Sequence, residues 1–246
     1  MKPFEQIENA LKCAVVHDPE YKTFREKTTK LSVLGLRLPV IHKIEMSGFP
    51  FYKDTSKQVL QTWSHIWQTS KIHEAMLVPL LYYRRNIHLL DDEHWRTMKR
   101  WIERVENWEH ADALCALYSI HLEKVPKLVM PTLKKWNRSQ NPWKRRASIV
   151  STIYYASPRR KTPTLKTVLS LIKPLLRDKY AYVQKAVGWQ LRECYKLWPR
   201  QTFEFFKKHV LSFSAIAFSY ATEKLTAQEK KTLKKLRERR NRFVKL

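Results

Sequence analysis

The sequence predicts an all-α solenoid of helical repeats, and three observations carry this prediction. Leu, Lys, Arg, Trp and Glu recur at helical spacing, whereas the alternating patterns that indicate strands are scarce. Signals for helix starts recur at a regular interval along the chain. Two helices fit into each interval, and stacked pairs of this kind bury their apolar faces against one another. The expected fold is therefore an array with a concave inner surface.

The repeat begins at about residue 55. Starts of the first helix in each pair are predicted near residues 55, 91, 125, 163 and 199, with steps of 36, 34, 38 and 36 residues. Starts of the second helix are predicted near residues 72, 107, 141, 178 and 212, with steps of 35, 34, 37 and 34 residues. Equivalent helices of successive repeats line the same side of a solenoid, so the second helices are expected to share one face.

The chain is interpreted as one domain, residues 1–246. Residues 1–54 are expected to form two or three capping helices with a loop around LSVLGLRLP, and residues 55–225 to form the repeats. Residues 226–246 are a basic C-terminal helix or tail. This segment either contacts phosphate or is a solvated run of charge, and the sequence leaves both interpretations open.

Charge points to a polyanionic partner. The chain has 48 Lys and Arg against 22 Asp and Glu, a formal net charge of +26. Self-repulsion of this size destabilises a compact state unless a polyanion relieves it. Nucleic acid is therefore the leading partner, and the alternatives are an unusually soluble surface and a repeat scaffold for acidic proteins.

Other classes of ligand and location are not expected. No segment approaches the roughly 20 apolar residues that span a membrane, and MKPFEQIENALK lacks the apolar region of a secretion signal. Three glycines are too few for the Gly-rich turns that bind nucleotide phosphates, and the nine His form no spaced zinc set with Cys13, Cys115 and Cys194. We expect no cofactor, no metal, reduced thiols and a cytoplasmic monomer, associated with the nucleoid if bacterial.

An unusual carboxylate lies near the start of one second-set helix. Asn107 is a good N-cap, which makes Trp108 the first helical residue and Asp112 the fifth. With Asn141 as the N-cap of the next such helix, Arg146 is also a fifth residue. Asp112 and Arg146 are therefore expected side by side on the concave face. A structural ion pair is the alternative to a functional role.

The third such helix, within DKYAYVQKAVGWQLRECYKLW, divides into two stripes. The apolar stripe consists of Val183, Val187, Leu191, Cys194 and Trp198, and the cationic stripe of Lys185, Trp189, Arg192 and Lys196. Gly188 precedes the tryptophan and indicates that something approaches the helix closely there. Function and packing against a neighbouring repeat both remain open for Trp189.

These segments resemble the HEAT-repeat alkylpurine DNA glycosylases of the AlkD type, a family of DNA alkylation repair proteins. The matching segments are NWEHADAL (107–114), PTLKKWNRSQNPWKRRASIVSTIYY (131–155) and DKYAYVQKAVGWQLRECYKLWP (178–199), with a weaker match in SAIAFSYATEKL (214–225). The resemblance implies a right-handed superhelical solenoid of HEAT-like repeats with a basic concave face.

The resemblance also implies roles for single residues. Trp108 and Trp189 would flank the damaged nucleotide, Asp112 would be the catalytic carboxylate, and Arg146 would grip the backbone beside it. Further DNA-binding candidates come from the basic segments around these positions, namely Arg145, Lys185, Arg192 and Lys196. The aromatic residue that completes the cradle in known members has no counterpart near Glu26, although Tyr21 and Phe24 are close by. Ser219 stands where the family often has an arginine.

The expected function is that of a DNA-3-methyladenine or alkylpurine glycosylase, a hydrolase of base excision repair that acts on duplex DNA with alkylated bases. Alkylation at N3 or N7 gives the purine a positive charge, so an anion that stabilises the sugar cation suffices for the chemistry. The first alternative is a non-catalytic binder of damaged or branched DNA. The others are a scaffold for acidic proteins and an RNA-binding repeat protein, for which no base-reading triplet is recognisable.

Overall fold

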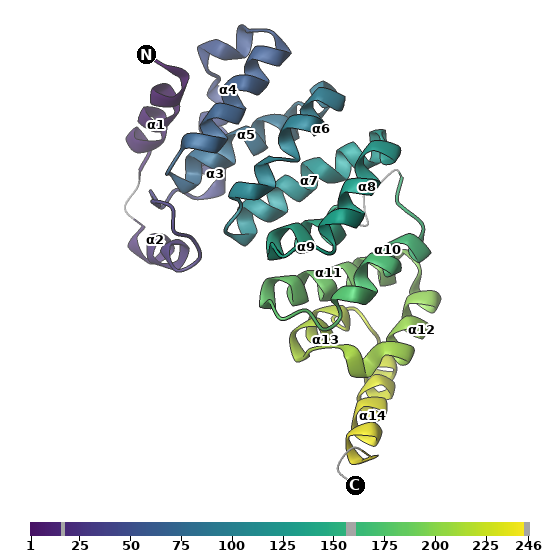
Figure 1. Cartoon of the computed structure of the whole chain (residues 1–246). Coiled ribbons are helices and arrows are strands. Elements are labelled where there is room, and N and C mark those ends of the chain that lie inside the picture. The colour runs from purple at the N-terminus through teal and green to yellow at the C-terminus, as the bar shows by residue number, and fades with distance from the viewer. Residues whose placement is uncertain (16–17, 156–160, 244–246) are drawn as a thin grey trace. The chain divides into compact units, whose positions relative to one another are not determined.

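The computed structural model describes residues 1–15, 18–155 and 161–243, and over these residues the chain is helical (Figure 1). Within these three ranges, extended pairing is limited to one isolated bridge between Ser32 and Ile72. The predicted all-α class is therefore confirmed. A search of the same residues finds no helix with the length and apolar character needed to cross a membrane.

The helices group into two compact units, Met1–Val125 and Pro126–Leu246. The first unit contains α1 (Pro3–Cys13), α2 (Pro19–Glu26), α3 (Leu38–Ser47), η1 (Pro50–Lys53), α4 (Ser56–Thr69), α5 (His73–Arg85), η2 (Ile87–Leu89), α6 (Asp92–Met98), η3 (Trp101–Arg104) and α7 (Trp108–Lys124). The second contains α8 (Pro126–Trp136), α9 (Pro142–Val150), α10 (Leu165–Ile172), η4 (Lys173–Leu175), α11 (Ala181–Leu197), α12 (Pro199–His209), η5 (Val210–Ser212), α13 (Ala215–Ala221) and α14 (Ala227–Phe243).

Helix starts follow the predicted period because their signals are local. The side chains of Thr55, Asp91, Asn107 and Asn141 each accept a hydrogen bond from a backbone N–H in the first turn of the helix that follows. Three later starts are shifted by two or three residues: α10, α11 and α13 begin at 165, 181 and 215. The repeat of paired helices is thus confirmed, with small errors at the starts predicted near 163, 178 and 212.

Aromatic side chains fill the core of the first unit. Trp67 and Trp101 stack with ring centroids 5.1 Å apart and an angle of 14° between the planes. The indole N–H of Trp67 donates to the carbonyl of Trp101 at 3.0 Å, and that of Trp101 donates to Ser64 Oγ at 3.1 Å. These bonds tie α4 to η3 and satisfy both buried donors.

A buried carboxylate shapes the loop before α3. Glu74 lies at the start of α5 and accepts the backbone N–H groups of Leu34, Gly35 and Leu36. Gly35 has φ +88°, a left-handed conformation that favours glycine. The LGL turn is therefore fixed to α5 by three converging donors, and the turn leads the chain back from α2.

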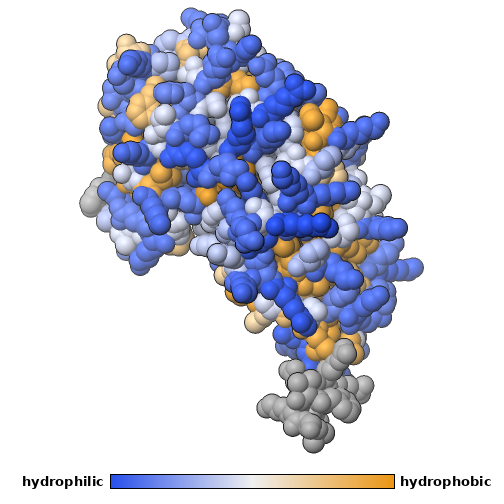
Figure 2. All heavy atoms as spheres, viewed as in Figure 1, coloured by the Kyte–Doolittle hydropathy of each residue, from blue (hydrophilic) through white to orange (hydrophobic). Residues whose placement is uncertain are grey.

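In the second unit the helices lie in two layers. Figure 1 shows α9, α11 and α13 on one side and α8, α10 and α12 on the other. A Cβ atom at Gly188 would lie 2.5 Å from Tyr220 Cβ and 2.6 Å from the Ala217 carbonyl oxygen. The close approach indicated by this glycine is thus made by helix α13, so structure explains the residue without a ligand. Hydrophilic side chains cover most of the face seen in Figure 2, with smaller groups of apolar ones among them.

Candidate functional site

The first turns of α7 carry the tryptophan and the carboxylate that the sequence singled out. The Asn107 side chain accepts the His110 N–H at 2.9 Å and sets the start of the helix. Trp108 and Asp112 lie one turn apart on its partly exposed side, whereas His110 is buried on the opposite side. The predicted register of this segment is therefore confirmed.

Arg25 lies against the Trp108 ring. Its guanidinium carbon is 5.1 Å from the centroid of Trp108, 5.1 Å from that of Tyr21 and 5.6 Å from that of Phe24. Arg25 is only 7 % exposed, whereas Phe24 is 52 % exposed. The arginine thus joins α2 to α7 through cation–π contacts that are strengthened by the loss of solvent.

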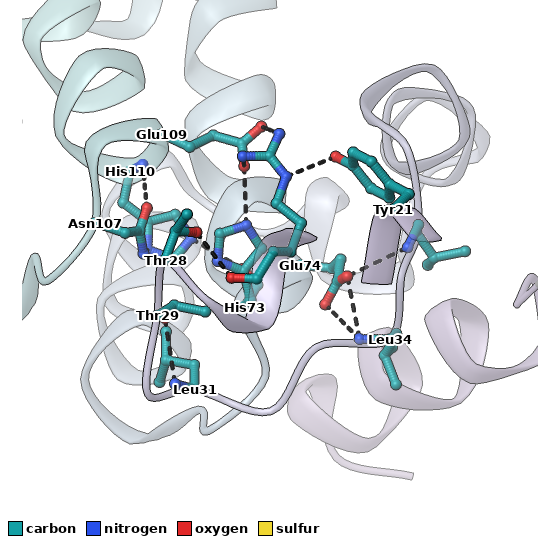
Figure 3. A network of polar contacts seen from close by, with 12 residues as sticks. Tyr21, Thr28, Thr29, Leu31, Leu34, His73, Glu74, Asn107, Glu109 and His110 are labelled. Carbon is teal, nitrogen blue, oxygen red and sulfur yellow. Dashed lines mark hydrogen bonds and ion pairs between the residues drawn. The ribbon is translucent and has the colours of Figure 1, made fainter. Parts of the chain in front are cut away.

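Glu109 holds this arginine in place. Arg25 Nη2 donates to Glu109 Oε1 and Nη1 lies beside Oε2, both at 2.9 Å, while Nε donates to the Tyr21 hydroxyl oxygen at 2.9 Å (Figure 3). The second carboxylate oxygen also lies 2.9 Å from His73 Nε2. A two-point ion pair of this kind fixes both the position and the plane of the guanidinium, so the rings around it are held as well.

Two stacked histidines lie beside the Arg25–Glu109 ion pair. The rings of His73 and His110 stack with centroids 4.4 Å apart, and His110 Nε2 is 3.0 Å from the His73 carbonyl oxygen. Burial and the neighbouring His73 hold the pKa of His110 well below its ordinary value. A neutral His110 adds no further charge beside the Arg25–Glu109 pair.

The roles of Arg25, Glu109 and His73 could not be predicted from the sequence. These residues are separated by tens of residues in the chain: the Arg25–Glu109 bond spans 84 positions, and the His73–Glu109 contact spans 36. Helical spacing carries no signal for contacts of this range. The one available hint was the position of Glu109 directly after Trp108.

In the second unit, Trp189 belongs to a cluster of aromatic rings. Its ring centroid lies 5.5 Å from that of Tyr154 and 5.7 Å from that of Tyr155. Tyr155 is 46 % exposed, and Trp189 is partly exposed. The indole N–H of Trp189 is buried and has no hydrogen-bond acceptor within the described part of the chain. The ring is therefore packed against neighbours on one side and open on another.

The arginines at the start of α9 are engaged inside this unit. Arg145 donates to both carboxylate oxygens of Asp178, at 2.6 and 3.0 Å, and to the carbonyls of Ser139 and Gln140, at 2.8 and 2.9 Å. Arg146 is 4 % exposed and donates to the carbonyl of Tyr182. Both side chains link the start of α9 to the segment that begins α11, so their geometry is that of structural ties.

The cationic stripe on α11 is largely neutralised by carboxylates. Arg192 pairs with Glu223 and lies 3.6 Å from Glu193, and Lys196 Nζ lies 2.8 Å from Glu193. Lys224 and Arg192 lower the pKa of the Glu223 carboxyl group, so it is charged near neutral pH. Lys185 instead lies 5.3 Å from the centroid of the Tyr182 ring. The stripe is less free to bind phosphate than its sequence indicated.

The apolar stripe on α11 is buried at four of its five positions, and Trp198 is partly exposed. Polar side chains on the same helix, Gln184, Gln190 and Glu193, are buried as well. The two-stripe pattern is thus correct for the apolar face but incomplete, because α11 is packed by neighbours on several sides.

Asp112 and Trp108 lie in the first compact unit, and Arg146 and Trp189 lie in the second. The predicted juxtaposition of these residues joins the two units and stays a prediction. Over the described ranges, no group of three or more His, Cys, Asp and Glu side chains could hold a metal ion. Cys13 is exposed, and Cys115 and Cys194 are buried as free thiols.

Paired helices define the class: this is a helical-repeat protein, with an arginine and aromatic rings at the start of α7. The chain belongs to the DNA alkylation repair enzyme family, whose model matches residues 14–225. The resemblance that the sequence motifs indicated is therefore confirmed. No curated protein sequence gives a match.

Solved structures share the fold. A protein from Enterococcus faecalis, described as a predicted DNA alkylation repair enzyme, matches with a TM-score of 0.71 and 16 % identity over 85 % of this chain and 94 % of that one. AlkD2 from Streptococcus mutans matches with a TM-score of 0.53 and 17 % identity over 89 % of this chain and 96 % of its own. The smu.31 protein of Streptococcus mutans UA159 matches with a TM-score of 0.52 and 17 % identity over 92 % and 97 %.

Proposed function

We propose that the protein is a DNA glycosylase of base excision repair that hydrolyses the N-glycosidic bond of cationic alkylated purines, such as 3-methyladenine and 7-methylguanine, in duplex DNA. Family membership and the net charge of +26 support DNA as the substrate class. The observation that carries the proposal is the pairing of Asp112 with Trp108 on α7, where the Arg25–Glu109 pair holds the tryptophan ring.

The proposed reaction needs little beyond an anion and aromatic faces. When the C1′–N bond breaks, its electron pair goes to the purine ring, which leaves as a neutral base because it was already cationic. Positive charge develops on the deoxyribose, and a carboxylate and ring faces stabilise it. Water adds to C1′ and loses a proton, for which Asp112 would be the acceptor.

The magnitude of this effect suits a labile substrate. At about 4 Å and an effective dielectric constant near 20, a carboxylate attracts a unit positive charge by roughly 4 kcal/mol. If this attraction acts only on the transition state, it raises the reaction rate by about a thousandfold. That factor is useful for a cationic purine and too small for an unmodified nucleotide, so selectivity would come from the charge of the lesion.

Within this proposal, Trp108 and Trp189 would contact the damaged nucleotide, and exposed Phe24 beside the Arg25 group is a candidate for the third aromatic residue. Lys185 would contact DNA phosphate. Arg145 and Arg146 would act mainly by fixing the start of α11, since their guanidinium groups bond to neighbouring protein atoms.

The proposal is tested by the release of free methylated base from methylated duplex DNA, measured by chromatography. Asp112→Asn should lower the release rate by about a thousandfold and leave DNA binding and the thermal unfolding midpoint close to those of the wild type. Asp54→Asn, at an exposed aspartate outside the site, is the matched control and should keep the wild-type rate. A wild-type rate in Asp112→Asn would exclude the assigned role.

A second candidate function is non-catalytic binding of damaged or branched DNA. The bond from Arg146 to the Tyr182 carbonyl favours it, because the resemblance to the glycosylases assigns this arginine to the backbone beside the lesion. This alternative predicts that the wild-type protein binds a branched duplex tightly and releases no base. A scaffold for acidic proteins would instead show little preference for DNA over acidic peptides at about 0.15 M salt.

A further inference from the structure

One long segment of the chain has no acidic residue. From Lys124 to Arg177 the sequence contains fourteen Lys and Arg residues and no Asp or Glu. The described part of this segment forms α8, α9, α10 and η4. Arg192 and Lys196 of α11 pair with carboxylates. The elements α8 to η4, in contrast, contribute cations and no acidic side chain.

A cavity between α8 and α10 gathers part of this charge. It has a volume of about 650 Å³ and is lined by Lys134, Lys135, Asn137, Arg138, Ser170, Leu171 and Pro174. Three of these residues are cations, all of them exposed, and none is an anion. A concave site with cations and polar groups over a small apolar floor is suited to a phosphate-bearing ligand.

The walls of this cavity are fixed before any ligand binds. Asn137 is 6 % exposed, and its side-chain amide donates to Ser148 Oγ and to the Leu171 carbonyl, both at 2.9 Å. The first bond ties the end of α8 to α9, and the second ties it to α10. Binding would therefore cost little ordering of the protein backbone.

The residues that line the cavity come from α8, α10, η4 and the turn after α8. Figure 1 shows α8 and α10 on the other side of the unit from α9, α11 and α13. Lys185 and Trp189, the proposed contacts of the first duplex, lie on α11 in the other layer and do not line the cavity. The charge of the cavity is left without a role in the proposed reaction.

We propose that the cavity between α8 and α10 binds the phosphodiester backbone of a second nucleic-acid segment, so that the protein can bridge two duplexes. The site goes beyond the proposed function and depends on it only for the position of the first duplex. Lys134 lies in the last turn of α8, and Arg138 lies two residues beyond the end of this helix at Trp136, so both cations are near the same end of α8.

Phosphate fits this surface better than an acidic protein does. Arg138 offers a guanidinium fork for phosphate oxygens, and the two lysines add point charges beside it. A stable protein partner needs a buried core of apolar and aromatic side chains over roughly 1,000 Å² or more. The cavity offers only Leu171 and Pro174 as apolar contacts.

The test is a bridging assay with the full chain. One duplex is immobilised on beads, the protein is bound, and capture of a second, labelled duplex is measured against salt concentration. In a triple variant, Lys134→Gln, Lys135→Gln and Arg138→Gln, capture should fall by at least about tenfold, and the slope of log affinity against log salt should drop by about 3. Binding to the first duplex should stay within about threefold.

Two control variants accompany it. Lys43→Gln, Lys53→Gln and Lys57→Gln remove the same charge from exposed lysines of the first unit and should leave capture unchanged. Lys134→Arg, Lys135→Arg and Arg138→Lys keep the charge of the cavity and should retain capture. Equal thermal unfolding midpoints establish that all variants are folded.

Four outcomes would overturn the inference. The wild-type protein could fail to capture a second duplex, or the triple Gln variant could capture it as well as the wild type. The triple Gln variant could instead lose binding to the first duplex, which would assign the cavity to the same DNA segment. Finally, a poly-glutamate peptide or inorganic phosphate could displace the second duplex at constant ionic strength more effectively than unlabelled DNA does. Base release is measured on the same variants, so failure of the glycosylase proposal is seen separately.

Discussion

At the scale of single residues, Glu109 links the start of α7 to α2 and α5. It holds Arg25 at two points, contacts His73, and through Arg25 fixes the rings of Trp108 and Phe24. Removal of one partner from a buried ion pair leaves the other charge without compensation in a poorly solvated place. The aromatic group that the proposed reaction uses therefore depends on a carboxylate that takes no part in the chemistry.

Replacement of this carboxylate should affect both stability and activity. Glu109→Gln should lower the free energy of unfolding by about 3 kcal/mol, because Arg25 stays buried and loses its counter-ion. Base release should fall more than DNA binding does, since the Trp108 ring loses its support. Denaturant unfolding and the release assay are the measurements. Glu93→Gln, at an exposed glutamate of α6, is the control, and equal unfolding curves for both variants would contradict the role.

At the scale of elements, local signals predicted where helices begin, and packing decided how their faces are used. The N-cap bonds at Asn107 and Asn141 span two or three residues, so they can be predicted from spacing. The burial of Glu193 on the polar side of α11 could not be predicted, because it depends on neighbours distant in sequence. Gly188 was predictable in part. A glycine inside a helix indicates that another element approaches closely, and the structure identifies this element as α13.

The contact of α11 with α13 predicts the sign of the stability change in the variant Gly188→Ala. Gly to Ala in a helix ordinarily stabilises it by about 1 kcal/mol. Gly188→Ala should instead destabilise the protein by roughly 1–3 kcal/mol, because the new Cβ meets Tyr220 Cβ and the Ala217 carbonyl and forces α13 to move. The shift of the denaturant midpoint measures the effect. A midpoint that rises would show that α13 is not packed closely on α11.

At the scale of the whole molecule, charge is the dominant property. The net charge of +26 opposes compaction, and every proton taken up in acid adds to it. Buried neutral histidines add to this sensitivity. Burial lowers the pKa of His121 to about 3, with His94 and Lys124 as further causes, and His110 is also held neutral. Folding therefore excludes protons that the unfolded chain would bind.

Acid should destabilise the protein over a defined range of pH. An unfolded histidine has a pKa near 6.5. Below pH 6.5 the unfolded chain therefore binds a proton at His121, whereas the buried His121 of the folded protein stays neutral until about pH 3. The free energy of unfolding should then fall as pH drops from about 6.5 towards 3, with about 1.4 kcal/mol per pH unit from His121 alone. His121→Leu should remove this part of the slope in denaturant unfolding at several pH values. If the free energy of unfolding has the same dependence on pH in the variant and the wild type, the prediction is wrong.

The sequence by itself determined the helical class, the repeat of paired helices, the caps that begin them and the family, because all of these depend on residues close together in the chain. It also determined that Trp108 and Asp112 share one face of α7. Only the tertiary structure decided that Arg25 and Glu109 support that face, that Arg145 is held by Asp178, and that the cations in and directly after α8 line a cavity beside α10. These contacts join residues tens of positions apart, and packing rather than spacing brings them together.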